Sequence, residues 1–449
     1  MSKLAFAARL GAVLAAMAAV SACASDPATT QSTAEPIRSH NPPARQTPVR
    51  VTQPARQPVS QAAQHPAMSP QAIANDSANF SRCIASLGEQ AQRRGISPAV
   101  YARETRDLDP DMKLLELLDR QPEFTKAVWD YVDQLVAERR IRQGREMFAQ
   151  HRVTFQRIEQ TYGIDPYVVA AIWGIESNFG ANKGDRDVIR STATLACIGR
   201  RQEFFRAEFL AAMEIVARGD IQRSHFKGSW AGAFGQTQFM PTTFKRLAVD
   251  FTGDGRRDLV DTVADALAST ANNLSKNGWQ RGISWGYEVE LPRNFNFKLA
   301  NRNTKKSAQE WASLGVKRVR NQPFPQTQGY ILAPAGARGP AFLMTRNFEV
   351  ILRYNPADAY ALAIGHLADR IRGAGPFEAD WPRGEQVLSR SERMELQERL
   401  SALGIYSGAI DGRLDDKTRV ALLEYQQRSG ITPDAFATAA LLERLRRGR

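Results

Sequence analysis

The chain has 449 residues, of which 43% are hydrophobic and 24% charged, a globular composition with room for two or three domains. The formal net charge of +13 favours an anionic partner, which leaves nucleic acid, a membrane surface and an acidic polymer open. After the N-terminus, no segment reaches the roughly 18 consecutive apolar residues that a membrane span needs.

The N-terminus has the pattern of a secretory signal peptide over residues 1–22. Two basic residues precede an apolar run from Leu10 to Val20, which is too short for a membrane span. The run ends in Val20-Ser21-Ala22-Cys23, which resembles a bacterial lipobox. That resemblance implies that Cys23 is lipidated and becomes the mature N-terminus. An ordinary cleaved signal with an incidental cysteine is the alternative.

Two further cysteines, Cys83 and Cys197, remain in the mature chain. An exported protein lies in an oxidising compartment, where such a pair is able to form a disulfide. Two buried free thiols are the alternative.

Residues 23–78 are rich in Gln, Pro, Ala, Ser and Arg and show no hydrophobic periodicity. Such a segment cannot bury a core, so we predict a disordered tether. As a flexible coil it would span roughly 40 Å, which suits a protein held on a membrane that reaches a nearby polymer.

The next region, residues 79–375, is predicted to be mainly helical. Its fold class is mainly α (α+β), because short alternating or apolar runs indicate a small inserted sheet at residues 287–291, 329–332 and 341–344. Amphipathic helices are expected at Phe124–Phe148, Gln202–Ala217, Val263–Asn277 and Ala357–Ile371.

A further helix is predicted from Asp165 to Gly180, with Glu176 near its C-terminus. Asp165 is a good N-cap, Pro166 fits the first helical position, and Gly180 is a natural stop. Glu176 shares an apolar helix face, so burial and the helix dipole both raise its pKa, as a general acid for glycosidic cleavage requires. A Glu176 paired with one of the abundant arginines is the alternative.

Residues 227–241 are dense in glycine, alanine and aromatic residues. The stretch lacks the Gly-Lys-Ser/Thr ending of a phosphate loop, so nucleotide binding is not expected. Its small residues allow a ligand to approach closely, and its Gln, Ser and aromatic side chains suit sugar recognition. A tight helix-packing loop is an alternative that the composition leaves open.

An Asp-rich stretch at residues 250–261 matches the calcium-loop template, with oxygens at positions 1, 3, 5, 9 and 12 and glycine at position 6. Thr at position 3 and Asp at position 12 both weaken the expected affinity. A longer loop would end at Asp265 instead, and an Asx-rich structural turn is the alternative to metal binding. The candidate ligands are Asp250, Thr252, Asp254, Arg256, Asp258, Asp261 and Asp265.

The last residues, 388–449, predict a small three-helix module after a boundary rich in glycine, proline and charges. Ser391 is expected to cap its first helix, and residues 417–428 form its second. The five histidines form no ligand-spaced cluster, and the sequence contains neither His-Glu-x-x-His nor Gly-x-Ser-x-Gly. A zinc or serine hydrolase is therefore not expected.

Taken together, these stretches resemble the lytic murein transglycosylase B family. The resemblance implies a lysozyme-like fold that cuts peptidoglycan between N-acetylmuramic acid and N-acetylglucosamine without water, leaving a 1,6-anhydromuramic end. The tail resembles a peptidoglycan-binding domain, with Asp411 and Tyr425 as candidate contacts. The stretches that carry the likeness are Ala171–Gly180, Gly199–Arg201, Ala231–Pro241, the Asp250 loop and Asn347–Ala363.

The resemblance also implies roles for single residues. Glu176 protonates the leaving oxygen and then takes the proton of the muramic C6 hydroxyl, so no cofactor is needed for catalysis. The loop at Asp250 implies a structural Ca²⁺. Asn273 stands where the family usually has Tyr, which puts one stacking contact in doubt. The implied sugar contacts are Ser229, Gln238, Tyr354, Asn355, Tyr360, Arg200 and Arg201.

The expected partners are peptidoglycan glycan strands and, through lipid on Cys23, the periplasmic face of the outer membrane, because Ala24 rather than Asp follows that cysteine. We expect no nucleic-acid partner and a monomer. Two other functions stay open. One is a muramidase that uses water, with Asp185 or Asp187 as second carboxylate, and the other is a non-catalytic lipoprotein that tethers the wall.

Overall fold

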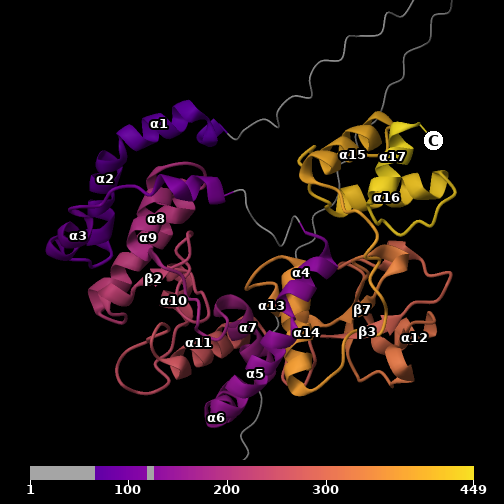
Figure 1. Ribbon diagram of the computed structural model, residues 1–449, viewed down its shortest axis with the longest axis horizontal. Coiled ribbons are helices and arrows are strands. Elements are labelled where there is room, and N and C mark those ends of the chain that lie inside the picture. The colour runs from indigo at the N-terminus through magenta and orange to yellow at the C-terminus, as the bar shows by residue number, and fades with distance from the viewer. Residues whose placement is uncertain (1–65, 119–125, 449) are drawn as a thin grey trace, which may run out of the picture. The chain divides into compact units, whose positions relative to one another are not determined.

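The computed structural model describes residues 66–118 and 126–448 (Figure 1). The chain divides into two units, Met1–Val59 and Ser60–Arg449, and all of the described residues belong to the second. The predicted signal peptide, Cys23 and most of the predicted tether lie outside the described residues. None of the helices within the described ranges combines the length and the apolar character of a membrane span.

Helices make up most of the described chain. The α-helices are α1 (Pro70–Ala78), α2 (Phe80–Arg93), α3 (Pro98–Thr105), α4 (Val128–Leu135), α5 (Glu138–Gln150), α6 (Arg152–Tyr162), α7 (Pro166–Ser177), α8 (Val188–Cys197), α9 (Gln202–Arg218), α10 (Pro241–Leu247), α11 (Val263–Lys276), α12 (Ala308–Ser313), α13 (Arg346–Ile351), α14 (Asp358–Arg372), α15 (Arg390–Ala402), α16 (Asp416–Arg428) and α17 (Ala439–Arg446). Short 3-10 helices are η1 (Pro66–Met68), η2 (Met112–Leu117), η4 (Arg223–His225), η5 (Phe297–Leu299), η6 (Val319–Asn321) and η7 (Gly336–Arg338).

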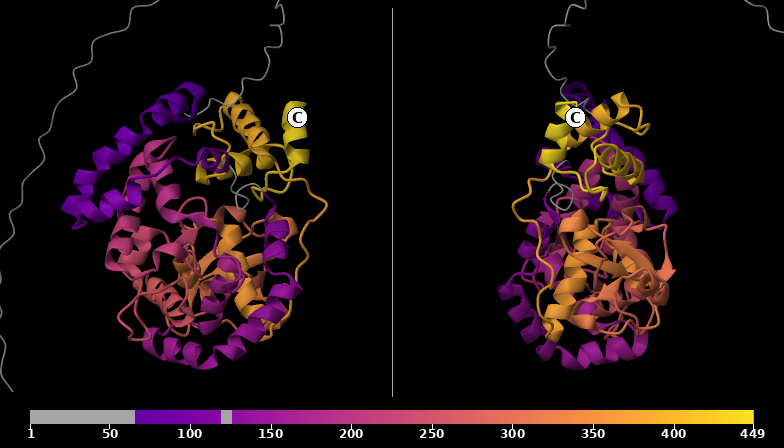
Figure 2. Two further views of the ribbon diagram at one scale, coloured as in Figure 1. Left: turned by 60° about the vertical axis from the view of Figure 1, so that its left-hand side comes forward. Right: turned by 90° about the vertical axis from the view of Figure 1, so that its right-hand side faces the viewer.

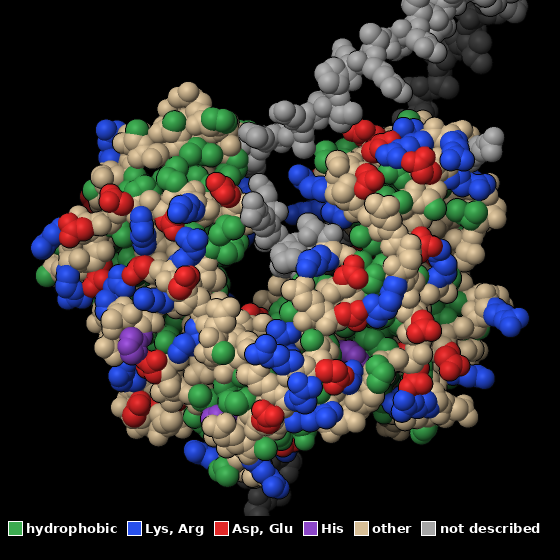
Figure 3. Space-filling model, in the orientation of Figure 1, with side chains coloured by type: hydrophobic (Ala, Val, Ile, Leu, Met, Phe, Trp, Pro, Cys, Tyr) green, Lys and Arg blue, Asp and Glu red, His purple; other side chains and the backbone are tan. Residues whose placement is uncertain are grey.

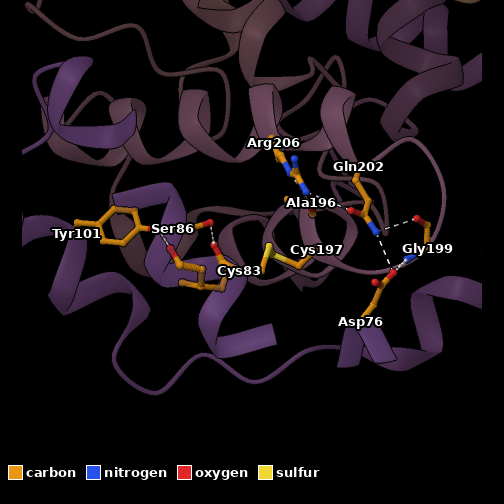
Figure 4. Close-up of a disulfide and its surroundings, with 10 residues drawn as sticks. Asp76, Cys83, Ser86, Tyr101, Ala196, Cys197, Gly199, Gln202 and Arg206 are labelled. Atoms are coloured by element: carbon orange, nitrogen blue, oxygen red, sulfur yellow. Dashed lines mark hydrogen bonds between the residues drawn. A yellow bond between two sulfur atoms is a disulfide. The ribbon is translucent and has the colours of Figure 1, made fainter. Parts of the chain in front are cut away.

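The prediction that the tether runs to residue 78 is wrong at its C-terminal end, because α1 occupies Pro70–Ala78. Ser69 caps this helix by accepting a hydrogen bond from the Ala72 amide at 3.2 Å. The Asp76 carboxylate accepts hydrogen bonds from the side chain of Gln202 at 2.9 Å and the amide of Gly199 at 3.4 Å (Figure 4). Polar contacts of this kind leave no hydrophobic period in the sequence, so the pattern did not reveal the helix.

Two sheets accompany the helices. The larger one has the order β4-β6-β7-β3-β5 with antiparallel neighbours, as expected for a small inserted sheet. In its centre Tyr330 faces Met344. The strands are β1 (Arg186–Asp187), β2 (Lys227–Gly228), β3 (Gly286–Glu290), β4 (Lys306–Ser307), β5 (Lys317–Arg318), β6 (Gln328–Leu332) and β7 (Ala341–Met344), with β1 and β2 paired separately.

Two buried apolar clusters build the region that carries Glu176. One surrounds α7 and α14, which pack against each other and against α5 (Figures 1 and 2). The other surrounds α8 and α9, a tightly packed pair. Tyr354 packs against both clusters, so the segment just before α14 lies where they meet.

Cys83 on α2 and Cys197 at the end of α8 form a disulfide with a Cα–Cα distance of 5.9 Å (Figure 4). The bond closes a loop with a sequence separation of 114 residues. Cross-linking so long a loop restricts the unfolded chain strongly, which stabilises the fold by about 4–5 kcal/mol in the chain-entropy account.

The C-terminal module consists of α15, α16 and α17 around an apolar cluster of its own. Its first helix is capped by Ser389, with Glu392 completing a capping box, so the prediction that Ser391 is the cap is wrong. The two serines lie close together, and only the one three residues before the glutamate satisfies the reciprocal capping geometry.

Candidate active site

Glu176 is the penultimate residue of α7, and its side chain is half-buried. The helix begins as predicted, because Asp165 accepts a hydrogen bond from the Tyr167 amide at 3.0 Å and Pro166 occupies the first position. It ends three residues earlier than the expected stop at Gly180. Asn178 takes the left-handed C-terminal position with φ 52°, which tolerates asparagine.

Two tyrosines from the segment around the start of α14 face this carboxylate. The Tyr360 hydroxyl donates a hydrogen bond to Oε1 of Glu176. Burial, followed by the negative charge of Glu176, holds the pKa of Tyr360 well above its ordinary value. The same two causes, in the same order, raise the pKa of Tyr354. Both hydroxyls therefore stay protonated at neutral pH and act as neutral donors.

The turn that follows Glu176, which we call the α7 turn (residues 177–180), is strained. Asn178, Phe179 and Gly180 all have positive φ, at 52°, 58° and 84°. Non-glycine residues adopt this conformation only where the surroundings hold them in it. Hydrogen bonds of Ser177 help to fix the backbone of this turn. Its hydroxyl donates to the backbone oxygen of Gln236 at 2.5 Å and accepts from the Gly180 amide at 2.8 Å.

Gln236 lies beneath the α7 turn and is nearly fully buried, with 5% of its surface exposed. Its Oε1 accepts a hydrogen bond from the Trp173 indole at 3.0 Å, and its Nε2 donates to the Val260 carbonyl at 3.3 Å. A Cβ on Gly180 would meet this Oε1 at 2.7 Å, so only glycine lets the turn approach so closely. Gln236 was not among the predicted site residues, and its place two residues before Gln238 in a stretch of small and aromatic residues was the available signal.

Tyr354 and Gln238 both contact the backbone of the loop of residues 231–240. The Tyr354 hydroxyl donates to the Thr237 carbonyl at 2.7 Å, which ties the chain before α14 to the loop of residues 231–240. Gln238, with φ 50°, donates from its amide to the carbonyls of Lys183 at 3.0 Å and Gly235 at 2.9 Å. Gln238 thereby closes its own turn.

Ser229 and Asn355 use their side-chain oxygens to hold backbone turns. The Ser229 hydroxyl accepts from the Ala233 amide at 3.1 Å, and Asn355 Oδ1 accepts from the Ala357 amide at 3.1 Å. The second contact steadies the entry to α14, the helix of Tyr360. Both side chains are half-buried, so contact with a sugar stays a prediction for each of them.

Arg200 and Arg201 are placed by the connection between α8 and α9. Arg200 donates to the Leu118 carbonyl at 2.5 Å, and the Arg201 guanidinium lies 4.4 Å from the ring centre of Phe204. Leu118 directly follows η2 and Phe204 lies in α9, so neither contact involves α7 or α14. Asn273 on α11 is buried, and its Oδ1 accepts from Asn277 at 2.6 Å.

The structure gathers three of the predicted metal ligands in the Asp-rich loop, residues 250–265. Carboxylate oxygens of Asp250, Asp254 and Asp265 all lie within 4.8 Å of one another. Asp265 is completely buried, and burial raises its pKa, although three backbone amides including Phe251 at 2.9 Å and Asp258 at 3.0 Å donate to it. The longer version of the loop, ending at Asp265, is the one that the structure assembles.

The other candidates in the loop have different partners. Asp261 pairs with His225 at 2.7 Å and lies 3.9 Å from the ammonium of Lys183. Asp258 accepts from the amides of Val260 and Asp261, both at 2.9 Å. The Arg256 guanidinium donates to the Asp220 carbonyl, and Thr252 donates to Asp250 at 3.3 Å. The prediction that the Asp261 side chain is a metal ligand is therefore wrong. This carboxylate pairs with His225 and lies near Lys183, outside the cluster of Asp250, Asp254 and Asp265.

Comparison with known proteins decides the family. The profile of the transglycosylase SLT domain matches residues 79–369, and that of a peptidoglycan-binding domain matches residues 389–445. The chain belongs to the SLT transglycosylase family. Membrane-bound lytic murein transglycosylase B of Escherichia coli (strain K12) is 30% identical over 274 residues, 58% of this chain and 73% of that relative.

Solved structures of family members share the fold. SltB3 of Pseudomonas aeruginosa, in complex with NAG-anhNAM-pentapeptide, is 45% identical, with a TM-score of 0.79 over 82% of this chain and 99% of that chain. Slt35 of Escherichia coli, in complex with calcium, is 26% identical, with a TM-score of 0.56 over 66% of this chain and 92% of that chain. The predicted lysozyme-like fold and C-terminal wall-binding module are confirmed, and this SLT transglycosylase is a lytic enzyme of peptidoglycan.

Proposed function

We propose that Glu176 is the single acid/base of a cleavage between N-acetylmuramic acid and N-acetylglucosamine that uses no water and leaves a 1,6-anhydromuramic end. The observation that carries the proposal is the Tyr360 hydroxyl at Oε1 of Glu176, which holds this carboxyl at the end of a rigid helix. A catalytic group on a braced element keeps the geometry that proton transfer needs.

In the first step, Glu176 gives its proton to the glycosidic oxygen as the bond to muramic C1 breaks. The positive charge that develops at C1 lies close to the carboxylate left on Glu176, which stabilises it. The buried hydroxyls of Tyr360 and Tyr354 add neutral dipoles and no competing charge.

In the second step, the C6 hydroxyl of the same muramic residue attacks C1 and gives its proton to Glu176. The enzyme thereby returns to its starting protonation state. A hydroxyl already attached to the substrate has a high effective concentration, so a second carboxylate to activate water is not required.

A water-using muramidase would need that second carboxylate, and the contacts of Asp187 disfavour this candidate. Asp187 caps α8 by accepting from the Arg190 amide at 2.9 Å and pairs with Arg223 at 2.6 Å. Asp185 is exposed. A carboxylate committed to a helix cap and an arginine is poorly suited to serve as a general base.

The test is mass spectrometry of muropeptides released from purified walls by the native enzyme, Glu176→Gln and Asp185→Asn. We expect anhydro ends from the native enzyme and from Asp185→Asn, and a loss of at least about a thousandfold for Glu176→Gln with an unchanged melting temperature. Reducing muramic ends would instead support the muramidase. Full wall digestion by Glu176→Gln would remove the assignment of Glu176, whereas no digestion by either the native chain or the variant would support a non-catalytic tether.

The Asp-rich loop supports a structural Ca²⁺ as part of the proposal. Three converging carboxylates, one of them fully buried, form the oxygen-rich donor set that this hard cation prefers, and the relative Slt35 has a calcium complex. Asp250, Asp254 and Asp265 would hold the ion. Bound there, it would neutralise the loop and take no part in proton transfer.

We also propose that lipid on Cys23 anchors the enzyme at the periplasmic face of the outer membrane. The sequence Val20-Ser21-Ala22-Cys23 and the "membrane-bound" name of the Escherichia coli relative support this. In cell fractionation, Cys23→Ser should move the protein from the outer-membrane fraction to the soluble periplasm. Recovery of the native protein with the inner membrane would contradict the sorting.

Finally, we propose that the strands this enzyme binds carry peptides. Both solved complexes of SltB3 contain a pentapeptide on the sugar, one as NAG-NAM-pentapeptide and one as its anhydro form. Peptides bring free carboxylates and amide groups, which need a binding surface of their own.

A further inference from the structure

The C-terminal module and the sheet region share a packed surface, formed by α16 and residues 297–303. Leu423 of α16 belongs to the same buried cluster as Phe297 and Trp311. The Arg419 guanidinium donates to the Phe297 carbonyl at 2.6 Å, and Asn303 donates to Asp416 at 3.5 Å. One apolar and two polar contacts therefore link the two elements.

A cavity of about 770 Å³ opens along this junction. Lys298, Asn301 and Asn303 line it from the sheet region. Arg419, Val420 and Gln427 are among the residues that line it from α16. The volume falls within the range of sites that bind small molecules or short peptides, and neither element forms the cavity alone.

Basic side chains outnumber acidic ones in the cavity lining, with Lys298, Arg419 and Arg428 against Asp416 and Glu424, and this balance favours an anionic group. Within the described residues, Arg428 pairs with Glu424, whereas neither Arg419 nor Lys298 forms an ion pair. Burial lowers the pKa of Arg419, and the negative charges of Asp416 and Asp434 raise it. In the described part of the chain, the half-buried Arg419 guanidinium donates to one backbone oxygen, and its further donors form a planar fork that matches a carboxylate.

The rest of the wall suits the other parts of a peptide. Asn301, Asn303 and Gln427 present amides that are able to exchange hydrogen bonds with peptide groups. Val420 is 62% exposed and offers contact area for alanine methyl groups.

We propose that this cavity binds a short wall peptide through its free C-terminal carboxylate, with Arg419 and Lys298 as the anionic subsite. The inference rests on the proposed substrate, a glycan strand that carries peptides. It assigns wall binding to a composite site between α16 and residues 297–303. The enzyme would then hold one peptide stem here while Glu176 acts on a glycan bond.

The probe is a synthetic N-acetylated stem pentapeptide ending in a free carboxylate, titrated into the purified full chain by calorimetry. We expect binding that weakens at least tenfold for the C-terminal amide of the same peptide and for Lys298→Gln. Lys417→Gln, which removes a charge from the exposed, non-lining side of α16, should bind as the native chain does. Arg419→Gln should show the same loss, with melting curves to check that the module stays packed.

Activity separates this inference from the proposed function. Lys298→Gln should keep anhydro-product formation from short peptide-free glycans while digesting insoluble wall more slowly. If the amide and the free acid bind equally, or if Lys298→Gln binds like the native chain, the cavity proposal is overturned and the reaction at Glu176 is untouched. If the native chain forms no anhydro product, the proposed function itself fails.

Discussion

The α7 turn and the Asp-rich loop are both irregular backbone segments held by side chains, and they are held in opposite ways. Under the α7 turn, the neutral amide of Gln236 is buried with partners for its oxygen and its nitrogen. In the loop, three carboxylates crowd within 4.8 Å, and the buried one, Asp265, depends on backbone amides. The first segment is complete without a ligand, whereas the second accumulates negative charge.

The two segments are also connected. Asp265 accepts from the Asp258 amide, Asp258 caps the turn at Val260, and the Val260 carbonyl accepts from Gln236. The Trp173 indole donates to Gln236 in turn, so four hydrogen bonds in series connect Asp265 to α7. The comparison teaches that neutral groups fix the α7 turn next to Glu176, while the carboxylates gather in a separate loop where a cation is able to balance their charge.

Between these two segments, the largest expected effect comes from Gln236→Leu, which keeps the volume and removes the amide. The buried Trp173 indole would lose its partner, and the Val260 carbonyl would keep only the Lys183 ammonium at 2.9 Å. The unfolding free energy should therefore fall by about 1–3 kcal/mol. With the α7 turn loosened, kcat should fall by about a hundredfold and KM should change little.

The matched control for this variant is Gln92→Leu on α2, whose side chain is exposed. It should change neither chemical denaturation nor the rate of anhydro-product release. A Gln236→Leu enzyme with native kcat would show that the amide is a packing feature and has no part in positioning Glu176.

A smaller effect is expected in the Asp-rich loop. Millimolar calcium should raise the melting temperature by a few degrees, since an ion that binds only the folded state stabilises it by mass action. Asp265→Asn should abolish the rise, whereas Asp261→Asn should keep it, because Asp261 faces His225 and Lys183. Differential scanning calorimetry with and without chelator measures this, and an unchanged curve for the native chain would refute the metal site.

The smallest effect concerns Asp369 on α14, a half-buried acid whose carboxylate, within the described residues, accepts from one side chain, the Trp285 indole at 2.9 Å. Burial raises its pKa from 3.8 to about 6, while Trp285 and Arg372 lower it and Asp165 raises it further. The folded state thus holds this proton more tightly than the unfolded state. The stability that the proton contributes is complete below about pH 4 and is lost as pH rises through about 6.

Asp369→Asn removes this titration and keeps an acceptor for Trp285. The variant should match the native chain near pH 4 and exceed its unfolding free energy by about 1–2 kcal/mol at pH 7. Urea denaturation at the two pH values provides the measurement. A variant that is equally or less stable at pH 7 would show that the ionised carboxylate is well compensated in the native fold.

Much of the fold was predictable from sequence because its signals are local. Asp165 and Pro166 mark the start of α7, and the apolar periods of residues 202–217 and 263–277 match α9 and α11 within a residue. The three apolar runs became β3, β6 and β7. Local signals did not predict helices that are stabilised by polar tertiary contacts. An example is α1, whose Asp76 accepts a hydrogen bond from Gln202 of α9.

For the site, the sequence alone determined which residue types lie near Glu176, since the residue's own helix, the glycine-rich stretch and the Tyr354–Tyr360 segment are recognisable by composition and likeness. Only the tertiary structure decided which of them meet. In the structure, the Tyr360 hydroxyl donates to Glu176, and the Gln236 backbone oxygen accepts from Ser177 in the α7 turn. Asp265 joins the carboxylate cluster, whereas Asp261 pairs with His225. Arg200 contacts Leu118, and Arg201 contacts Phe204. Periodicity places a side chain on a face, whereas the partner of a buried polar group depends on elements far away in the chain.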